Sequence, residues 1–203
     1  RERLKKAAER FSNEGYAVLR YDFGGSGESD DSPVTVKNYS DDLRSAIKYV
    51  RERGYENVGL LGESLGGLAS ILAYDENIKS LVLWSSITSS KVPDLYRNDE
   101  EEIERKGFVI KKKDGKDFKI PKEYFDERRT INQKEILSKI KCPVLIIHGS
   151  EDDAVPFEDC KNALRYLPKG SKLEVIEGAR HKLEEKINEV ISISLDWFKK
   201  YLN

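Results

Sequence analysis

Short apolar strands alternate with amphipathic helices along most of this chain, and this alternation restricts its fold more than any other feature. The first helix shows the pattern clearly, because Leu4, Ala7, Ala8 and Phe11 recur at the spacing that lines one helical face. Such alternation predicts an α/β domain whose mostly parallel sheet carries helices on both faces. The 203 residues are enough for one domain with a sizeable core and few for two.

The periodicity also places the individual elements. Helices are identified by an apolar residue every three or four positions, and strands by short apolar runs between turn residues. We expect helices over about 4–15, 40–53, 65–74, 157–167 and 183–201, and strands over 16–21, 58–61, 79–84, 143–148 and 172–176.

The segment 85–141 breaks this rhythm. Two short apolar runs, 108–110 and 118–120, flank Asp114-Gly115, a dipeptide suited to a type I′ hairpin turn. We therefore expect an insertion that carries a β-hairpin and lies inside a single domain formed by residues 1–203.

The overall composition excludes several classes of partner. The formal net charge is −1, from 36 basic and 37 acidic residues, so no field of one sign is available to attract nucleic acid or an anionic membrane. The longest apolar runs have about five residues, far below the roughly 20 needed to span a bilayer. The chain also shows no signal peptide.

The sulfur-containing and amide residues bear on compartment and source. Cys142 opens an apolar strand and Cys160 lies on the apolar side of a helix, so both are interpreted as small buried hydrophobes. One such pair is no disulfide scaffold, which favours a cytoplasmic protein. Abundant Lys and Glu with a single Gln and no Met are typical of heat-adapted proteins, and the omission of substituted methionines from the sequence is the alternative interpretation of the missing Met.

The run Gly62-Glu63-Ser64-Leu65-Gly66 has the pattern G-x-S-x-G and lies between a predicted strand and a predicted helix. In this context the strand turns sharply into the helix and exposes the serine hydroxyl. The backbone N–H of Leu65 then lies at the positive end of a helix, where it can point at an oxyanion. A structural Gly-rich turn is the alternative interpretation.

A serine hydroxyl needs a neighbouring base to act as a nucleophile at neutral pH. The chain contains two histidines. His148 ends an apolar strand, where a hydrogen-bonded structural histidine is the favoured interpretation. His181 lies in a loop after the next strand, and such loops assemble the sites of parallel sheets. The sequence therefore favours His181 as the base, with a surface histidine as the alternative.

An acid that orients the base is expected on a loop between the nucleophile and the histidine, because a G-x-S-x-G serine at a strand-to-helix turn is followed along the chain by its acid and then by its histidine. The cluster Glu151-Asp152-Asp153 follows the strand ending at His148. A buried carboxylate there would fix the imidazole tautomer. Spacing alone leaves the choice within the cluster open.

At this point the chain resembles the α/β-hydrolase superfamily, especially small bacterial and archaeal esterases of the cinnamoyl- or feruloyl-esterase and monoglyceride-lipase-like kinds. The resemblance implies that the acid lies three residues before the Val-Pro pair, at Asp152, with Asp153 as the alternative. Many members have His before the nucleophile where this chain has Glu63, which leaves substrate preference open. The matching segments, in the family's order, are 21–29, 62–67, 148–156 and 178–181.

The same resemblance implies further residues before Arg1. Family members have a strand ahead of the first helix, placed between the strands expected at 16–21 and 58–61. They also take a second oxyanion donor from the loop that follows that strand. We therefore expect a few tens of residues upstream, with at least one strand and this donor.

Cofactor sites are not predicted. The loop 24–27 is rich in glycine but has neither the full G-x-G-x-x-G pattern nor the Lys-Ser/Thr of a phosphate-binding loop. Two histidines and two distant cysteines have no metal-ligand spacing. We expect no cofactor and no metal.

The predicted function is that of a serine esterase that forms an acyl-enzyme on Ser64 from a small or medium acyl or aryl ester. A serine peptidase of the same fold and a non-catalytic binding relative are the alternatives. The partner is a small-molecule ester, and a homodimer is left open. The insertion is expected to act as a small lid, and its aromatic residues are candidate pocket walls or ordinary packing residues: Tyr96, Phe108, Tyr124 and Phe125.

Overall fold

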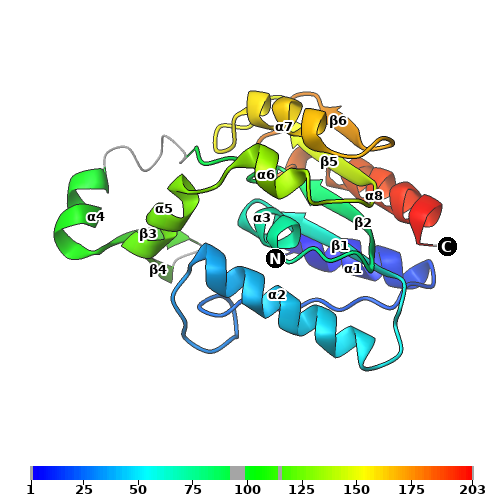
Figure 1. The fold of residues 1–203 in the computed structure, drawn as a ribbon, viewed down its shortest axis with the longest axis horizontal. Coiled ribbons are helices and arrows are strands. Elements are labelled where there is room, and N and C mark those ends of the chain that lie inside the picture. The colour runs from blue at the N-terminus through cyan, green and yellow to red at the C-terminus, as the bar shows by residue number, and fades with distance from the viewer. Residues whose placement is uncertain (1, 92–98, 114–115, 203) are drawn as a thin grey trace.

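The computed structural model describes residues 2–91, 99–113 and 116–202. Its central sheet has four parallel strands (Figure 1). In spatial order these strands are β1 (Val58–Glu63), β2 (Ile78–Trp84), β5 (Val144–Gly149) and β6 (Lys172–Ile176).

The two faces of the sheet bury different side chains. In β2, Leu81 and Leu83 belong to one hydrophobic cluster and Val82 and Trp84 to the other, because successive side chains of a strand point to opposite faces. Helices cover both faces, which confirms the predicted α/β class (Figure 1). The first cluster includes α2 (Val36–Arg51), α3 (Leu65–Leu72), α6 (Gln133–Leu137) and α7 (Phe157–Ala163), and the second includes α1 (Glu2–Asn13) and α8 (Ile187–Tyr201).

The strand predicted over 16–21 is wrong, because the structure assigns no strand to this segment. Within the described residues β1 pairs only with β2, and Val18 and Leu19 are 41% and 46% exposed. An apolar run becomes a strand only when a neighbouring strand accepts its backbone hydrogen bonds.

Several helices begin or end away from their predicted positions for identifiable reasons. Helix α2 begins at Val36, four residues early, because the Thr35 side chain accepts a hydrogen bond from the Asn38 N–H and so acts as an N-cap. Glu127 adds a second cap, accepting from the Val36 N–H at 2.6 Å. The helix predicted from 183 begins as a 3₁₀ turn (Glu184–Lys186) before α8, and α7 ends in another, Leu164–Tyr166.

The segment between β2 and β5 contains the predicted hairpin, formed by β3 (Phe108–Lys113) and β4 (Lys116–Pro121). Its described residues also contain three helices that the sequence did not predict: α4 (Glu100–Lys106), α5 (Lys122–Arg129) and α6. Figure 1 shows the hairpin with α4 and α5 at the left-hand end of the molecule. The predicted turn at Asp114-Gly115 lies outside the described residues.

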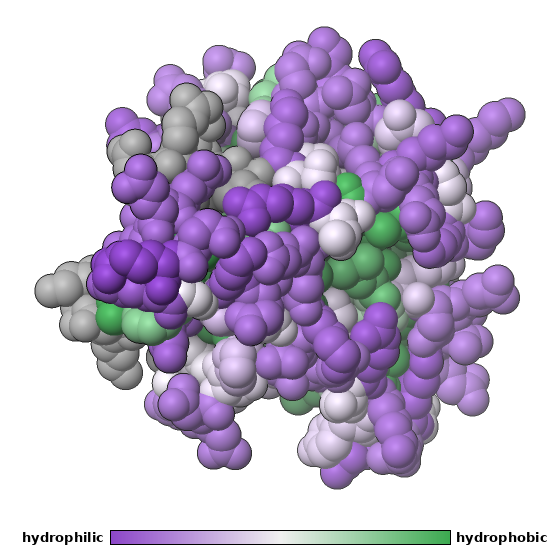
Figure 2. Space-filling model, turned by 60° about the vertical axis from the view of Figure 1, so that its left-hand side comes forward, coloured by the Kyte–Doolittle hydropathy of each residue, from purple (hydrophilic) through white to green (hydrophobic). Residues whose placement is uncertain are grey.

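The surface is largely polar. Figure 2 shows hydrophilic side chains over most of the visible face, with apolar residues gathered in a recess right of centre. In the part of the chain that the structure describes, no helix is long and apolar enough to cross a membrane.

Candidate active site

Ser64 lies in the sharp turn between β1 and α3. Its backbone has φ 53° and ψ −117°, a strained conformation for a residue with a side chain. The Ser64 N–H donates to the Trp84 carbonyl at 3.0 Å, and the Ser64 carbonyl accepts from Gly67 and Leu68, which starts α3. These bonds hold the serine at the carboxyl edge of the sheet, as a nucleophile elbow requires.

The predicted base lies directly against this serine. His181 follows β6 in the loop that precedes α8, and its Nε2 is 3.1 Å from the Ser64 Oγ. The imidazole side chain is 20% exposed, so it is reachable from solvent while being held by its neighbours. The distance is that of a hydrogen bond between a hydroxyl donor and a nitrogen acceptor.

Asp152 lies on the opposite edge of the imidazole. Its two carboxylate oxygens are 3.0 and 2.9 Å from the His181 Nδ1, and Oδ1 also accepts from the N–H groups of Ala154 and Val155 at 2.9 Å each. Burial opposes ionisation of this carboxyl, but the bonds from His181 and Val155 outweigh it and lower the pKa of Asp152. An ionised Asp152 places the Nδ1 proton on its own side and leaves Nε2 free to accept from Ser64.

His148 supports the loop that carries the acid. Its Nε2 is 3.0 Å from the Val155 carbonyl and 3.4 Å from the Asp152 Oδ2, and its Nδ1 is 3.0 Å from the Cys160 Sγ. Burial lowers the pKa of His148, so the ring is neutral at neutral pH. Because a carbonyl only accepts, the Nε2 carries the proton. His148 is therefore the hydrogen-bonded structural histidine that the sequence favoured.

Leu65 is the first residue of α3. The first N–H groups of a helix have no carbonyl partner within that helix, so the Leu65 N–H is in the position expected for an oxyanion donor. The predicted second donor, upstream of Arg1, stays a prediction.

The aromatic residues of the insertion occupy a different environment from the triad. Tyr124 and Phe125 are 6% and 1% exposed and belong to the first hydrophobic cluster. Phe108 is partly buried and lies under the Lys119 ammonium, whose nitrogen is 4.3 Å from the ring centroid. Of the two interpretations, the structure favours packing for Tyr124 and Phe125. Tyr96 lies outside the described residues.

A different aromatic group lies beside the elbow, and sequence reasoning missed it as a site feature. The Phe23 ring stacks on Tyr39 with 4.2 Å between centroids and 9° between planes. A Cβ built on Gly66 would be 3.6 Å from the Phe23 ring. In the sequence, 21–29 is a segment of the family resemblance that contains a glycine-rich loop, and nothing local in it indicates that Phe23 packs against the elbow.

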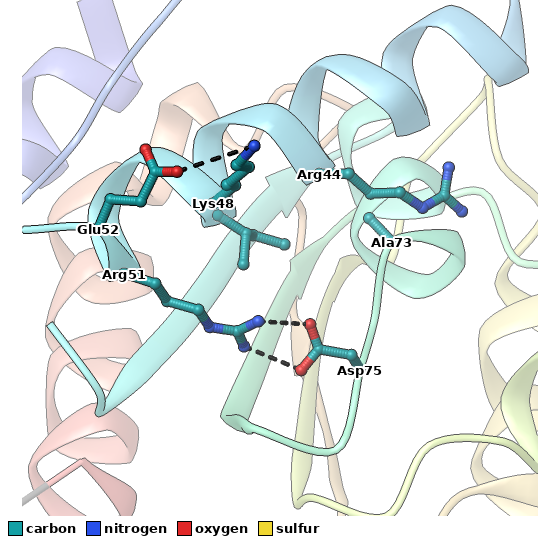
Figure 3. Close-up of a pocket in the computed structure, with 7 residues that line it drawn as sticks. Arg44, Lys48, Arg51, Glu52, Ala73 and Asp75 are labelled. Atoms are coloured by element: carbon teal, nitrogen blue, oxygen red, sulfur yellow. Dashed lines mark hydrogen bonds and ion pairs between the residues drawn. The ribbon is translucent and has the colours of Figure 1, made fainter.

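Two cavities among the described residues lie apart from the triad. A surface pocket of about 360 Å³ lies between α2 and the end of α3. Figure 3 shows Arg51 and Asp75 facing each other across it, joined by two hydrogen bonds of 2.8 and 2.9 Å. It contains no triad residue. A cavity of about 10 Å³ beside Ile87 and Val155 has room for about one water molecule.

Fold and site together define a serine hydrolase of the α/β-hydrolase fold, which confirms the resemblance seen in the sequence. The family model described as "Serine aminopeptidase, S33" matches residues 1–105, and the chain belongs to this family.

Proteins with several different names are similar to this chain in sequence. An Escherichia coli "Uncharacterized 31.7 kDa protein in traX-finO intergenic region" is 25% identical over 245 aligned positions, which cover 96% of this chain and 84% of the relative. The human "Serine hydrolase BPHL" is 24% identical, covering 83% of this chain and 64% of the relative. The mouse "Palmitoyl-protein thioesterase ABHD10, mitochondrial" is 28% identical, covering 71% and 51%.

Solved structures agree with the fold. Est1E from Butyrivibrio proteoclasticus, a structure with ferulic acid bound, has a TM-score of 0.84 at 25% identity and covers 99% of this chain and 83% of that one. The Paleococcus ferrophilus monoacylglycerol lipase has a TM-score of 0.78 at 20% identity, with 97% and 88% covered. At 20% identity, the likeness to the lipase structure shows a shared fold and nothing more.

Proposed function

We propose that the protein hydrolyses carboxylic esters of small or medium acyl or aryl groups through an acyl-enzyme on Ser64. The observation that carries this proposal is the unbroken line of contacts from the Ser64 hydroxyl through His181 to Asp152, at 3.1 and 2.9 Å. A nucleophile, its base and an orienting carboxylate in hydrogen-bond contact are the arrangement needed for acyl transfer.

The reaction follows from these contacts. The Ser64 Oγ attacks the ester carbonyl while the His181 Nε2 takes its proton, and Asp152 stabilises the imidazolium that forms. His181 then gives that proton to the departing alcohol, which leaves Ser64 acylated. A water molecule then gives a proton to His181 and attacks the acyl carbon. His181 returns that proton to the Ser64 Oγ as the acyl–oxygen bond breaks, which releases the carboxylic acid and restores the Ser64 hydroxyl.

The negative charge on the oxygen of the tetrahedral intermediate must be stabilised by hydrogen-bond donors. The Leu65 N–H at the start of α3 supplies one, in a position where the helix dipole also favours negative charge. We propose that the second comes from residues upstream of Arg1. No metal or cofactor takes part in this scheme.

The choice of an ester over an amide draws on the relatives. One relative at 28% identity is named a palmitoyl-protein thioesterase, an enzyme that cleaves a sulfur ester, and the structure of Est1E at 25% identity has ferulic acid bound. A serine peptidase is the second candidate, because the matched family is described as a serine aminopeptidase. The non-catalytic alternative is disfavoured by the contact of His181 with both Ser64 and Asp152.

The insertion 85–141 acts, in this proposal, as a lid within the single domain. Helix α5 is attached beside the triad, since Arg128 donates to the carbonyls of Ser89 and Lys91 and the neighbouring Ile87 N–H donates to the Ser64 carbonyl at 3.2 Å. A homodimer stays a prediction that light scattering would decide.

The test is hydrolysis of p-nitrophenyl esters from acetate to palmitate by the wild-type protein and by Ser64→Ala. Turnover that peaks at short or medium chains and vanishes in the variant is the expected result. Aminoacyl p-nitroanilides and acyl thioesters run in parallel, so that preferential cleavage of an anilide would replace the esterase by the peptidase. A fluorophosphonate probe that fails to label Ser64 would favour the non-catalytic relative.

A further inference from the structure

Arg3, in the first turn of α1, contacts the end of strand β1 just before Ser64 and the loop just after His181. Its Nη2 donates to the Glu63 Oε1 at 2.7 Å, and its Nη1 donates to the Lys182 carbonyl. Glu63 immediately precedes Ser64, and Lys182 immediately follows His181. One guanidinium therefore connects the neighbour of the nucleophile to the neighbour of the base.

This bridge is sheltered from solvent. The side chains of Arg3 and Glu63 are 14% and 16% exposed. A third contact, to Glu184 at 3.7 Å, involves a carboxylate that is 61% exposed and adds little, because exposed ion pairs are screened. The planar fork of arginine suits two acceptors at fixed angles, which the single ammonium group of lysine does not reproduce.

The loop that Arg3 contacts is otherwise under strain. Leu183 has φ 55° and ψ 21°, the left-handed region that a non-glycine residue adopts at a cost. Such a conformation persists only where surrounding contacts hold it. Leu183 is 1% exposed in the second hydrophobic cluster, its N–H donates to the Arg180 carbonyl at 2.9 Å, and Arg3 holds the carbonyl just before it.

We propose that Arg3 is a positioning residue that fixes the Ser64 hydroxyl and the His181 imidazole relative to each other by bridging Glu63 and Lys182. The inference rests on the proposed roles of Ser64 and His181, and it gives Glu63, which stands where many relatives of this fold have His, a function in the geometry of the elbow.

The first measurement is steady-state ester hydrolysis by Arg3→Ala, Arg3→Lys and Glu63→Gln. Misplacement of reacting groups lowers turnover more than binding, so we expect Arg3→Ala to lower kcat about tenfold or more while KM stays within about twofold. We expect Arg3→Lys to keep part of the turnover that Arg3→Ala loses, because a lysine ammonium can bond either the Glu63 carboxylate or the Lys182 carbonyl but not both. The double variant Arg3→Ala/Glu63→Gln is expected to lose no more than Arg3→Ala alone, since the two side chains act as one unit.

The second measurement needs no activity. Hydrogen exchange of peptides covering 178–186 is compared in wild type, Arg3→Ala and the control Arg10→Ala, which removes the same charge from the same helix. Arg10 pairs at 3.0 Å with Glu14 and its side chain is 56% exposed. Faster exchange in Arg3→Ala alone is expected. If Arg3→Ala does not fold, Arg3→Lys replaces it in this comparison.

The two measurements distinguish a failure of the proposed function from a failure of the proposed Arg3 bridge. A wild-type protein that hydrolyses no substrate overturns the proposed function, and the exchange data still decide whether Arg3 holds the loop. Wild-type kcat in Arg3→Ala, a fall in kcat matched by Arg10→Ala, or exchange in 178–186 unchanged by the loss of Arg3 would each overturn the bridge.

Discussion

At the scale of single residues, the Asp152 carboxylate is held by hydrogen bonds to both of its oxygens. Its side chain is fully buried, and its oxygens meet the His181 ring and the N–H groups of Ala154 and Val155. The neighbouring Asp153 is exposed. The geometry therefore favours Asp152 over Asp153 as the acid.

Replacing Asp152 by Asn should lower kcat by about 10³–10⁴, because an amide that donates to Nδ1 stabilises the wrong imidazole tautomer. The measurement is kcat for the preferred ester in Asp152→Asn, with Asp153→Asn as the matched control that keeps wild-type turnover. If Asp153→Asn carries the larger loss, the assignment of the acid is reversed.

The glycines of the G-x-S-x-G motif differ in what the structure demands of them. A Cβ on Gly62 would lie 2.4 Å from the Gly66 carbonyl oxygen, whereas the nearest atom to a Cβ on Gly66 is a Phe23 carbon at 3.6 Å. The first distance is a severe clash with backbone and the second is ordinary contact.

Gly62→Ala should therefore lower the melting temperature by several degrees, since about 1 kcal/mol shifts the midpoint of a domain this size by roughly 2–4 °C and overpacking costs roughly 1–3 kcal/mol. Gly66→Ala is the control, expected within a degree or two of wild type. Calorimetry of both variants checks this, and equal midpoints would show that the elbow backbone moves freely.

The sequence alone was sufficient to assign some of these residues to the candidate site and not others. Ser64 and His181 follow from local signals, a motif at a strand-to-helix junction and a loop after a strand. Asp152 could not be separated from Asp153 by spacing, because the distinction depends on which carboxylate the fold buries. Arg3 was invisible for the same reason: its partners are 60 and 179 residues away.

At the scale of elements, α8 is attached to β2 by two buried indole hydrogen bonds. The Trp84 Nε1 donates to the Ser194 Oγ at 2.9 Å, and the Trp197 Nε1 donates to the Ser80 Oγ at 2.8 Å. These bonds run in opposite directions between helix and strand, so they fix the position of α8 along the sheet. Helix α8 in turn follows the loop of His181.

Ser194→Ala should destabilise the fold by about 1–3 kcal/mol, because it leaves the buried Trp84 N–H without an acceptor. The control is Ser45→Ala, at an exposed serine that makes the same bond to a carbonyl four residues earlier, with an expected change within about 0.5 kcal/mol. Urea titration measures both. A Ser194→Ala midpoint equal to that of Ser45→Ala would contradict the prediction.

Helices and strands with a strong apolar periodicity were predicted well. Elements whose formation depends on a neighbouring strand or on tertiary packing were not. Strand β6 has the predicted bounds, and β1, β2 and β5 shift by one or two residues. The segment 16–21 has a strand-like pattern but no neighbouring strand among the described residues. Helix α4 is rich in acidic residues, and its one buried residue, Ile103, attaches it to the core, which is too weak an apolar pattern to predict a helix from the sequence.

At the scale of the whole molecule, the response to pH depends on buried groups more than on net charge. The pKa of His148 is lowered by burial, with a smaller opposing effect from the Asp152 carboxylate, and Cys160, Asp159 and His181 lie around the same ring. The pKa of Asp152 is also lowered. In each case the unfolded chain binds protons at a higher pH than the folded one.

These two groups act in different pH windows. The stabilising effect of Asp152 is present above the unfolded pKa of about 3.9 and is lost as the pH falls below it towards the folded value. For His148, the unfolded state gains a proton below about pH 6.5, whereas the folded state gains it only at a lower pH because burial lowers the pKa of the ring. Stability should therefore begin to fall near pH 6.5, well before the carboxylates are protonated.

His148→Gln isolates this effect, because the glutamine amide replaces the Nε2–H that bonds the Val155 carbonyl and does not titrate. We expect wild type to lose free energy of unfolding between pH 6.5 and 5 with a slope of at most about 1.4 kcal/mol per pH unit, and the variant to show a flatter dependence over the same range. Urea titrations at a series of pH values measure both slopes. Parallel slopes would mean that His148 is protonated in the folded protein, and would remove the neutral ring that the contacts to Val155 and Cys160 imply.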